Sequence, residues 1–175
     1  MSVTQFEGGL TLTELLVVVS IVGVVALMAY PNVMEMIYRM ESKRAESVIY
    51  EALRSARNES HIRRRNIIVC PANKQNVCDK TAKEKMIVFV DLNNNHRLDA
   101  GELIVEHDLN LKHGRLDMRV SLSRNYIKYF GGSATPRGHF GHIKYCSMSS
   151  KQELSYRVVL THQGRVTRRG ALGEC

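Results

Sequence analysis

The sequence lacks the residue constellations that most enzyme classes require. Its seven histidines are scattered, and their spacing indicates no Ser-His-Asp or Cys-His arrangement (His61, His96, His107, His113, His139, His142 and His162). The one glycine-rich stretch, 130–141, has neither the lysine nor the glycine spacing of a phosphate-binding loop, so we expect a flexible connection. His139, in this stretch, and His142, directly after it, lie close together, which is only a weak indication of a metal site. We therefore expect neither an enzyme nor a cofactor.

The four cysteines lack the C-x-x-C spacing and the histidine pair of a zinc site. In an exported domain, four thiols indicate two disulfides, with three alternative connectivities. Cys70 and Cys78 bracket a short loop that would close at low cost. We favour that pair, which leaves Cys146 to hold the terminal residue, Cys175.

Charge is almost absent near the N-terminus, where Leu10–Ala29 contains Glu14 and otherwise almost only Leu, Val, Ile, Ala and Met. Twenty residues in a helix span roughly 30 Å, which is enough to cross the hydrocarbon core of a membrane. A carboxylate is costly in that environment, so Glu14 should have a partner or a function.

An ordinary signal peptide is the alternative interpretation of this segment. Such signals have a basic n-region, a shorter apolar core and a small-x-small cleavage site, and none of these is present. The leader 1–9 contains no Lys or Arg and does contain Glu7, so the positive-inside rule says little about orientation.

Gly9, directly before the apolar run, together with Thr11, Leu12, Glu14 and Leu15 resembles the start of type IV prepilins. The resemblance implies that a prepilin peptidase cuts between Gly9 and Leu10 and methylates the new N-terminus. Glu14 is then the fifth residue of the mature chain. We expect its carboxylate to meet the Leu10 amine of a neighbouring subunit at the same depth.

The formal net charge of +8 is unevenly distributed. Residues 30–61 contain five bases and five acids, whereas residues 62–175 contain 20 bases and 10 acids. A basic globular head attracts polyanions, with nucleic acid first among them. The alternative is a soluble surface that is merely basic.

Apolar residues at helical spacing resume after Pro31, so we expect one long helix to about Asn58, with Gly23 and Pro31 as points of bending. The pattern then changes to period two and predicts eight short antiparallel strands (66–70, 85–90, 103–107, 117–122, 126–130, 142–148, 156–161 and 165–167). One helix followed by strands is an α+β arrangement. The resemblance to prepilins implies its type IV pilin-like form, a long N-terminal helix packed on a small antiparallel sheet. The expected domains are a leader (1–9), a transmembrane helix (10–30), an amphipathic spine (31–60) and a β-rich head (61–175).

The stretch from Asp91 to Glu102 partly matches a twelve-residue calcium loop. Its oxygen ligands would be Asp91, Asn93, Asn95, Asp99 and Glu102. However, His96 replaces the glycine that the loop needs, and strands flank it. We favour a β-hairpin tip whose Asn and Asp side chains bond their own backbone.

With Gly164-Arg165-Val166-Thr167-Arg168-Arg169 near the C-terminus, the whole chain resembles the FimT/GspH family of minor pilins. In DNA-binding members a C-terminal Gly-Arg-x-Arg stretch contacts DNA. Gly164 and Arg165 match it, Thr167 stands at the second arginine, and Arg168 and Arg169 follow. Arg137 and Lys144 are the next candidates for phosphate contact.

The resemblance implies a minor pilin whose basic head binds double-stranded DNA without sequence preference, for uptake in natural transformation. The alternatives are a structural pilin that primes pilus assembly, a type II secretion pseudopilin, and a monomeric membrane-anchored periplasmic domain. It further implies a single pass through a Gram-negative inner membrane with a periplasmic head, then a pilus at the cell surface. The expected partners are other pilin subunits, the prepilin peptidase, the inner membrane and DNA.

Overall fold

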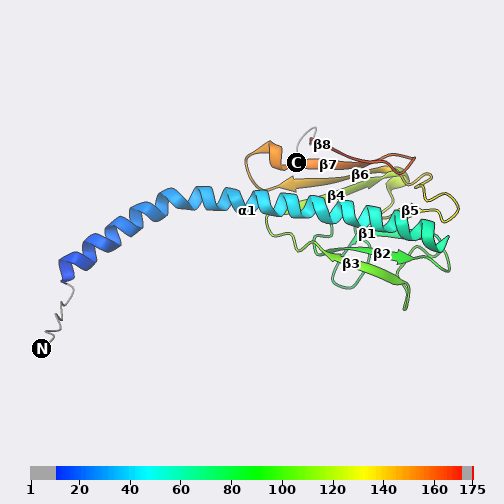
Figure 1. Ribbon diagram of the computed structural model, residues 1–175, viewed down its shortest axis with the longest axis horizontal. Coiled ribbons are helices and arrows are strands. Elements are labelled where there is room, and N and C mark those ends of the chain that lie inside the picture. Colours follow the sequence, from blue (N-terminus) through cyan, green and yellow to red (C-terminus); the bar gives the residue numbers. More distant parts are fainter. Residues whose placement is uncertain (1–10, 171–174) are drawn as a thin grey trace, which may run out of the picture. The chain divides into compact units, whose positions relative to one another are not determined.

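The computed structural model of the chain describes residues 11–170 and 175, coloured along the sequence in Figure 1. One helix, α1 (Leu12–Arg63), is followed by eight strands. Residues up to Ile37 and residues from Tyr38 onward form two compact units, so α1 contributes to both. The helix continues through Pro31, as expected, and ends five residues later than the predicted Asn58.

The strands form two four-stranded antiparallel sheets rather than the single sheet that we predicted. The first sheet has the order β3-β2-β1-β5 and the second has the order β4-β6-β7-β8. The bounds of the strands are β1 (Ile67–Ala72), β2 (Lys85–Val90), β3 (Leu103–Asp108), β4 (Gly114–Val120), β5 (Ile127–Tyr129), β6 (Gly141–Ser147), β7 (Tyr156–Leu160) and β8 (Val166–Gly170). The expected α+β, pilin-like fold class is confirmed.

The core lies where the second half of α1 packs on both sheets. Its helical contribution is a stripe of fully buried apolar residues (Ala45, Ile49, Ala52, Leu53 and Ala56). Three of these are alanines, whose small side chains let the helix backbone lie close to the strands. Every residue of β1 is buried, as a strand covered on both faces must be.

The second sheet is covered on one face only. Buried and partly exposed residues alternate along β7, so Tyr156, Val158 and Leu160 face the core. The opposite face, which we call the outer face, is directed to solvent.

Candidate filament segment and nucleic-acid interface

The first half of α1 presents apolar side chains to its surroundings in every direction. From Leu12 to Leu27 the large apolar residues keep between 49% and 80% of their surface exposed. This helix is long and apolar enough to span a membrane. Within the described part of this unit, no protein surface covers these side chains, so their burial must come from lipid or from other chains.

Glu14 lies in the first turn of α1, where its charge complements the helix dipole. Its backbone amide donates a hydrogen bond to the Thr11 hydroxyl, at 3.3 Å, so Thr11 caps the helix. Ser20 donates to the Leu16 carbonyl, at 2.8 Å, and is therefore satisfied within the helix. The Glu14 carboxylate has no partner among residues 11–170 and 175. Gly9 and Leu10, the predicted processing site, lie outside the described residues.

The C-terminal arginines lie on both faces of the second sheet. Arg168 and Arg169 both lie in β8, so their side chains point to opposite faces of the sheet. Arg168 faces α1, with its Nε 3.2 Å from Glu46 Oε1 and its guanidinium 5.1 Å from the centre of the Tyr156 ring. This arginine is therefore occupied by an ion pair and a cation–π contact within the head.

Arg165 precedes β8 in the turn that returns from β7. Gly164, with a φ of +81°, adopts the left-handed conformation that this turn requires. The amides of Gly164 and Arg165 donate to the carbonyl and hydroxyl of Thr161, at 2.9 and 3.1 Å. Arg165 lines a cavity on the helix side of the sheet, so it lies on the same side as Arg168 and opposite Arg169.

Arg169 belongs instead to a row of charged residues across the outer face. The strand register aligns Asp117, Lys144, Arg157 and Arg169 on β4, β6, β7 and β8. Strands lie about 4.8 Å apart, so the row extends roughly 14 Å. It carries three bases and one acid.

A second row on this face contains Arg119 and His142, and Arg115 lies further along β4. Arg119 Nε donates to Asp117 Oδ2, at 2.9 Å. The two charges of this pair neutralise each other, so Asp117 does little to offset the charge of the other bases on this face. Burial lowers the pKa of His142, and so do Arg157 and then Arg119, whereas Asp117 acts in the opposite direction. The low pKa of His142 reflects both its burial and the positive electrostatic potential of the outer face.

We define the basic outer face as Arg115, Arg119, Lys144, Arg157 and Arg169. Of this set, only Lys144 and Arg169 are predicted as DNA contacts from the sequence alone. The sequence does indicate that the other three side chains face away from the core. Arg115 and Arg119 alternate with apolar residues along β4, and Arg157 does so on β7. That they meet on one face depends on strand register, which one sequence does not reveal.

A family model described as Type II transport protein GspH matches residues 47–164, more than half of the chain. The chain belongs to the GspH family. The family comprises minor type IV pilins and type II secretion pseudopilins, which are structural proteins without enzymatic activity. No curated protein matches the sequence.

Among solved structures, the fold is similar to two crystal structures of the type IV minor pilin FimU from Pseudomonas aeruginosa strain PAO1. The identity is 15% in both cases, with TM-scores of 0.53 and 0.51. Each comparison covers 73% of this chain, and 86% or 90% of the FimU chain. At this identity the likeness shows the fold alone.

In this GspH-family chain, a lysine from a neighbouring strand is paired with the loop from Asp91 to Glu102. Lys128, on β5, is 5% exposed, and its Nζ lies 3.0 Å from Asp91 Oδ2 and 3.1 Å from Asn94 Oδ1. The His96 Nε2 atom is 3.2 Å away. The ammonium group thus pairs with the first carboxylate of the suspected calcium loop.

The remaining oxygens of this loop bind its own backbone and amides. The two Glu102 oxygens accept from the amides of Leu92 and Asp99, each at 3.0 Å. Asp99 accepts from the side chains of Asn93 and Asn95, each at 2.8 Å. No group of three His, Cys, Asp or Glu side chains in the described residues is arranged to hold a metal. The hairpin-tip interpretation therefore fits the structure better than the calcium loop does.

The structure contains both expected disulfides, Cys70–Cys78 and Cys146–Cys175. The first closes the loop after β1, and the second joins the last residue to β6.

The connection from Phe130 to Gly141 is held by hydrogen bonds, whereas the sequence suggested a flexible link. The Gly138 carbonyl accepts from Arg124 Nη1, at 2.7 Å, and from the Ser121 hydroxyl. Arg137 is exposed on this connection. His139 is buried beside Tyr126 and Phe130, with ring centres 5.5 and 5.7 Å away, and burial lowers its pKa.

Proposed function

We propose that this chain is built into a type IV filament, a pilus or a type II secretion pseudopilus, through the first half of α1. The observation that carries the proposal is an apolar helix exposed on all its sides, with one unpartnered carboxylate. In hydrocarbon, Glu14 requires a counter-charge. The amine of a processed neighbour beginning at Leu10 supplies one at the same depth.

Before assembly, the same segment anchors the subunit in the inner membrane, with the head in the periplasm. Two disulfides fit that location, since disulfides persist in oxidising compartments. The peptidase acts between Gly9 and Leu10. Intact mass measurement tests this step, because a mature chain that still begins at Met1 contradicts it.

The filament role is tested by shearing filaments from cells and probing them for this subunit. Its recovery in the filament fraction, dependent on the prepilin peptidase, is the expected result. A subunit confined to the membrane fraction would leave the monomeric anchored domain as the better interpretation.

The basic outer face favours a second function, the binding of double-stranded DNA for uptake in natural transformation. Duplex DNA carries one negative charge per about 1.7 Å of its axis, so a row of roughly 14 Å faces several phosphates at once. Arginine forks match phosphate geometry, and the Arg157 Nε is buried without an acceptor among the described residues. Phosphate contact without base reading predicts weak binding of any sequence.

Within this proposal the sequence-based candidates have unequal parts. Arg169 and Lys144 contact phosphate together with Arg157, whereas Arg119 is paired with Asp117. Arg168 is engaged by Glu46, so its removal should act mainly on the head itself. Gly164 and Arg165 lie at the cavity on the helix side of the sheet, away from the basic outer face, so Arg165 contributes only through overall charge. Arg137 is exposed on the connection before β6 and adds to the positive charge of the head.

Fluorescence anisotropy with a labelled duplex, using the full chain in nonionic detergent, tests this second function. We expect a Kd of about 10⁻⁴ to 10⁻⁶ M that weakens steeply with salt. The double variant Arg157→Gln/Arg169→Gln should weaken binding to all sequences and lower the salt slope by about 2. Arg97→Gln, an exposed base on another surface, is the control and should change little.

In cells, the double variant should lower transformation while filaments still form. Undetectable binding by the wild type at low salt would contradict a DNA role. Equal binding by the double variant and the control would remove the basic outer face from it. Either result leaves the structural pilin or pseudopilin function.

A further inference from the structure

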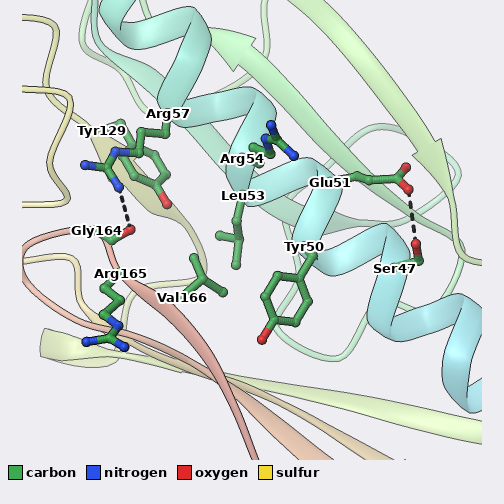
Figure 2. A pocket seen from close by; sticks show the side chains of 10 residues that line it. All are labelled: Ser47, Tyr50, Glu51, Leu53, Arg54, Arg57, Tyr129, Gly164, Arg165 and Val166. Carbon is green, nitrogen blue, oxygen red and sulfur yellow. Dashed lines mark hydrogen bonds between the residues drawn. The ribbon is translucent and has the colours of Figure 1, made fainter.

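A cavity of about 450 Å³ opens within the head, away from the basic outer face. It lies between α1, the end of β5 and the turn that leads into β8 (Figure 2). Leu53, Val166 and the rings of Tyr50 and Tyr129 give it an apolar lining. A volume of this order suits one small organic molecule.

Three guanidinium groups surround this apolar lining. Arg54 and Arg57 come from α1, and Arg165 comes from the turn before β8. Arg57 Nη1 donates to the Gly164 carbonyl, at 3.1 Å, and so fastens the helix to that turn. The one acid of the lining, Glu51, accepts from the Ser47 hydroxyl, at 3.1 Å, and Figure 2 shows this pair on the side away from Arg165. The cavity therefore has a net positive charge.

Tyr129 supplies an unused hydrogen-bond donor at this site. Its side chain is 0% exposed, and its hydroxyl has no hydrogen-bond partner among the described residues. Burial raises the pKa of Tyr129, although Arg57 opposes this, so the hydroxyl stays protonated. Figure 2 shows its oxygen directed toward the space beside Leu53 and Val166. A buried donor without an acceptor is costly, and a ligand oxygen would satisfy it.

We propose that this cavity binds a single nucleotide, with its phosphate at Arg165 and Arg57 and its base against Tyr50, Leu53 and Val166. A bare phosphate would leave the apolar lining uncovered. An apolar molecule would leave the Tyr129 hydroxyl and the guanidinium groups of Arg54 and Arg165 unmatched. A nucleotide matches both the apolar lining and the charged groups. Its phosphate is a charged oxyanion, and its base is a flat ring that packs on apolar and aromatic side chains.

Two ligands would present a nucleotide to this cavity, a free nucleotide and the terminal nucleotide of a DNA strand. Only the second rests on the proposed DNA binding. In either case the Tyr129 hydroxyl lies below the accessible surface. The ligand therefore reaches it only when neighbouring side chains shift on binding.

Calorimetric titration of the full chain in nonionic detergent with deoxyadenosine 5′-monophosphate tests the proposal. The nucleotide should bind more tightly than either deoxyadenosine or inorganic phosphate. Arg165→Gln should weaken it about tenfold or more, as loss of a charge-assisted hydrogen bond does. Tyr129→Phe keeps the buried ring and should weaken it several-fold. Arg169→Gln removes the same charge from the outer face and should have no effect.

The proposal is overturned if the nucleotide fails to bind, if inorganic phosphate binds as tightly, or if neither Arg165→Gln nor Tyr129→Phe weakens binding. Competition with two duplexes, one blunt and one with a 5′-phosphorylated overhang, identifies the source. Displacement by the overhang alone supports a DNA end, and displacement by neither supports a free nucleotide. Duplex binding that depends on Arg157 and Arg169 is measured separately, so failure there leaves the cavity result intact.

Discussion

The two halves of α1 belong to one continuous helix but differ in where their apolar side chains are buried. Up to Ile37 the apolar side chains point in all directions and stay exposed. Between Ala45 and Ala56 they form one buried stripe, and charged residues such as Glu51 and Arg54 occupy the remaining sides. The first half must find its apolar partner outside the chain, whereas the second half has it in the two sheets. Assembly and head stability should therefore respond to different substitutions.

The largest effect is expected at Glu14. Glu14→Ala removes the only charge between Leu10 and Ala29 and should abolish recovery of the subunit in sheared filaments, because the neighbour's amine loses its partner. Membrane insertion and the thermal unfolding of the head should be unchanged. Normal incorporation of the variant would show that the two halves do not differ in this way.

In the head, the strongest effect should follow removal of Lys128. Lys128→Met leaves the buried Asp91 carboxylate without its counter-charge and should lower the free energy of unfolding by about 3–5 kcal/mol. Urea titration followed by circular dichroism measures this, since the chain has no tryptophan. Arg97→Met is the matched control, because Arg97 is an exposed base in the loop that contains Asp91. A small loss in Lys128→Met would contradict the prediction and would mean that another group compensates the Asp91 charge.

A pair of identical substitutions compares the two halves of α1 directly. Ile49→Ala opens a cavity in the core and should cost about 2–5 kcal/mol. Ile21→Ala, where the side chain is 58% exposed, should leave the urea midpoint of the head unchanged. Equal shifts in both variants would contradict the division of roles.

The smallest effect concerns pH and belongs to the head alone. The pKa of His139 is lowered by burial, so below about pH 6.5 the unfolded chain binds a proton that the folded chain does not. Stability is therefore fully present above that pH and falls as the solution becomes more acidic. His139→Gln should flatten the fall between pH 7.5 and 5.5, whereas His162→Gln, at an exposed turn, should not. Because His142 also has a lowered pKa, part of the slope should remain.

Local periodicity was enough to predict the helix and all eight strands, since each depends on neighbouring residues. It could not show that the strands divide into two sheets, because pairing joins segments far apart in the chain. The same reason hid the contact of Arg168 with Glu46, 122 positions earlier. The burial of Lys128 could be predicted in part, because a lysine inside the apolar run Tyr126–Phe130 indicates a buried partner. Finding Asp91 as that partner required the fold.

The bond between Cys146 and Cys175 also has a mechanical consequence. It turns β7 and β8 into a closed covalent loop. Suppose that DNA bound at Arg169 is pulled away from the anchored helix. Without the disulfide, the segment between Cys146 and Arg169 would unfold and extend to roughly 80 Å. With the bond in place, the shorter arm of the loop limits that extension to roughly 20 Å. The head then behaves as a short tether that passes tension to the filament instead of yielding to it.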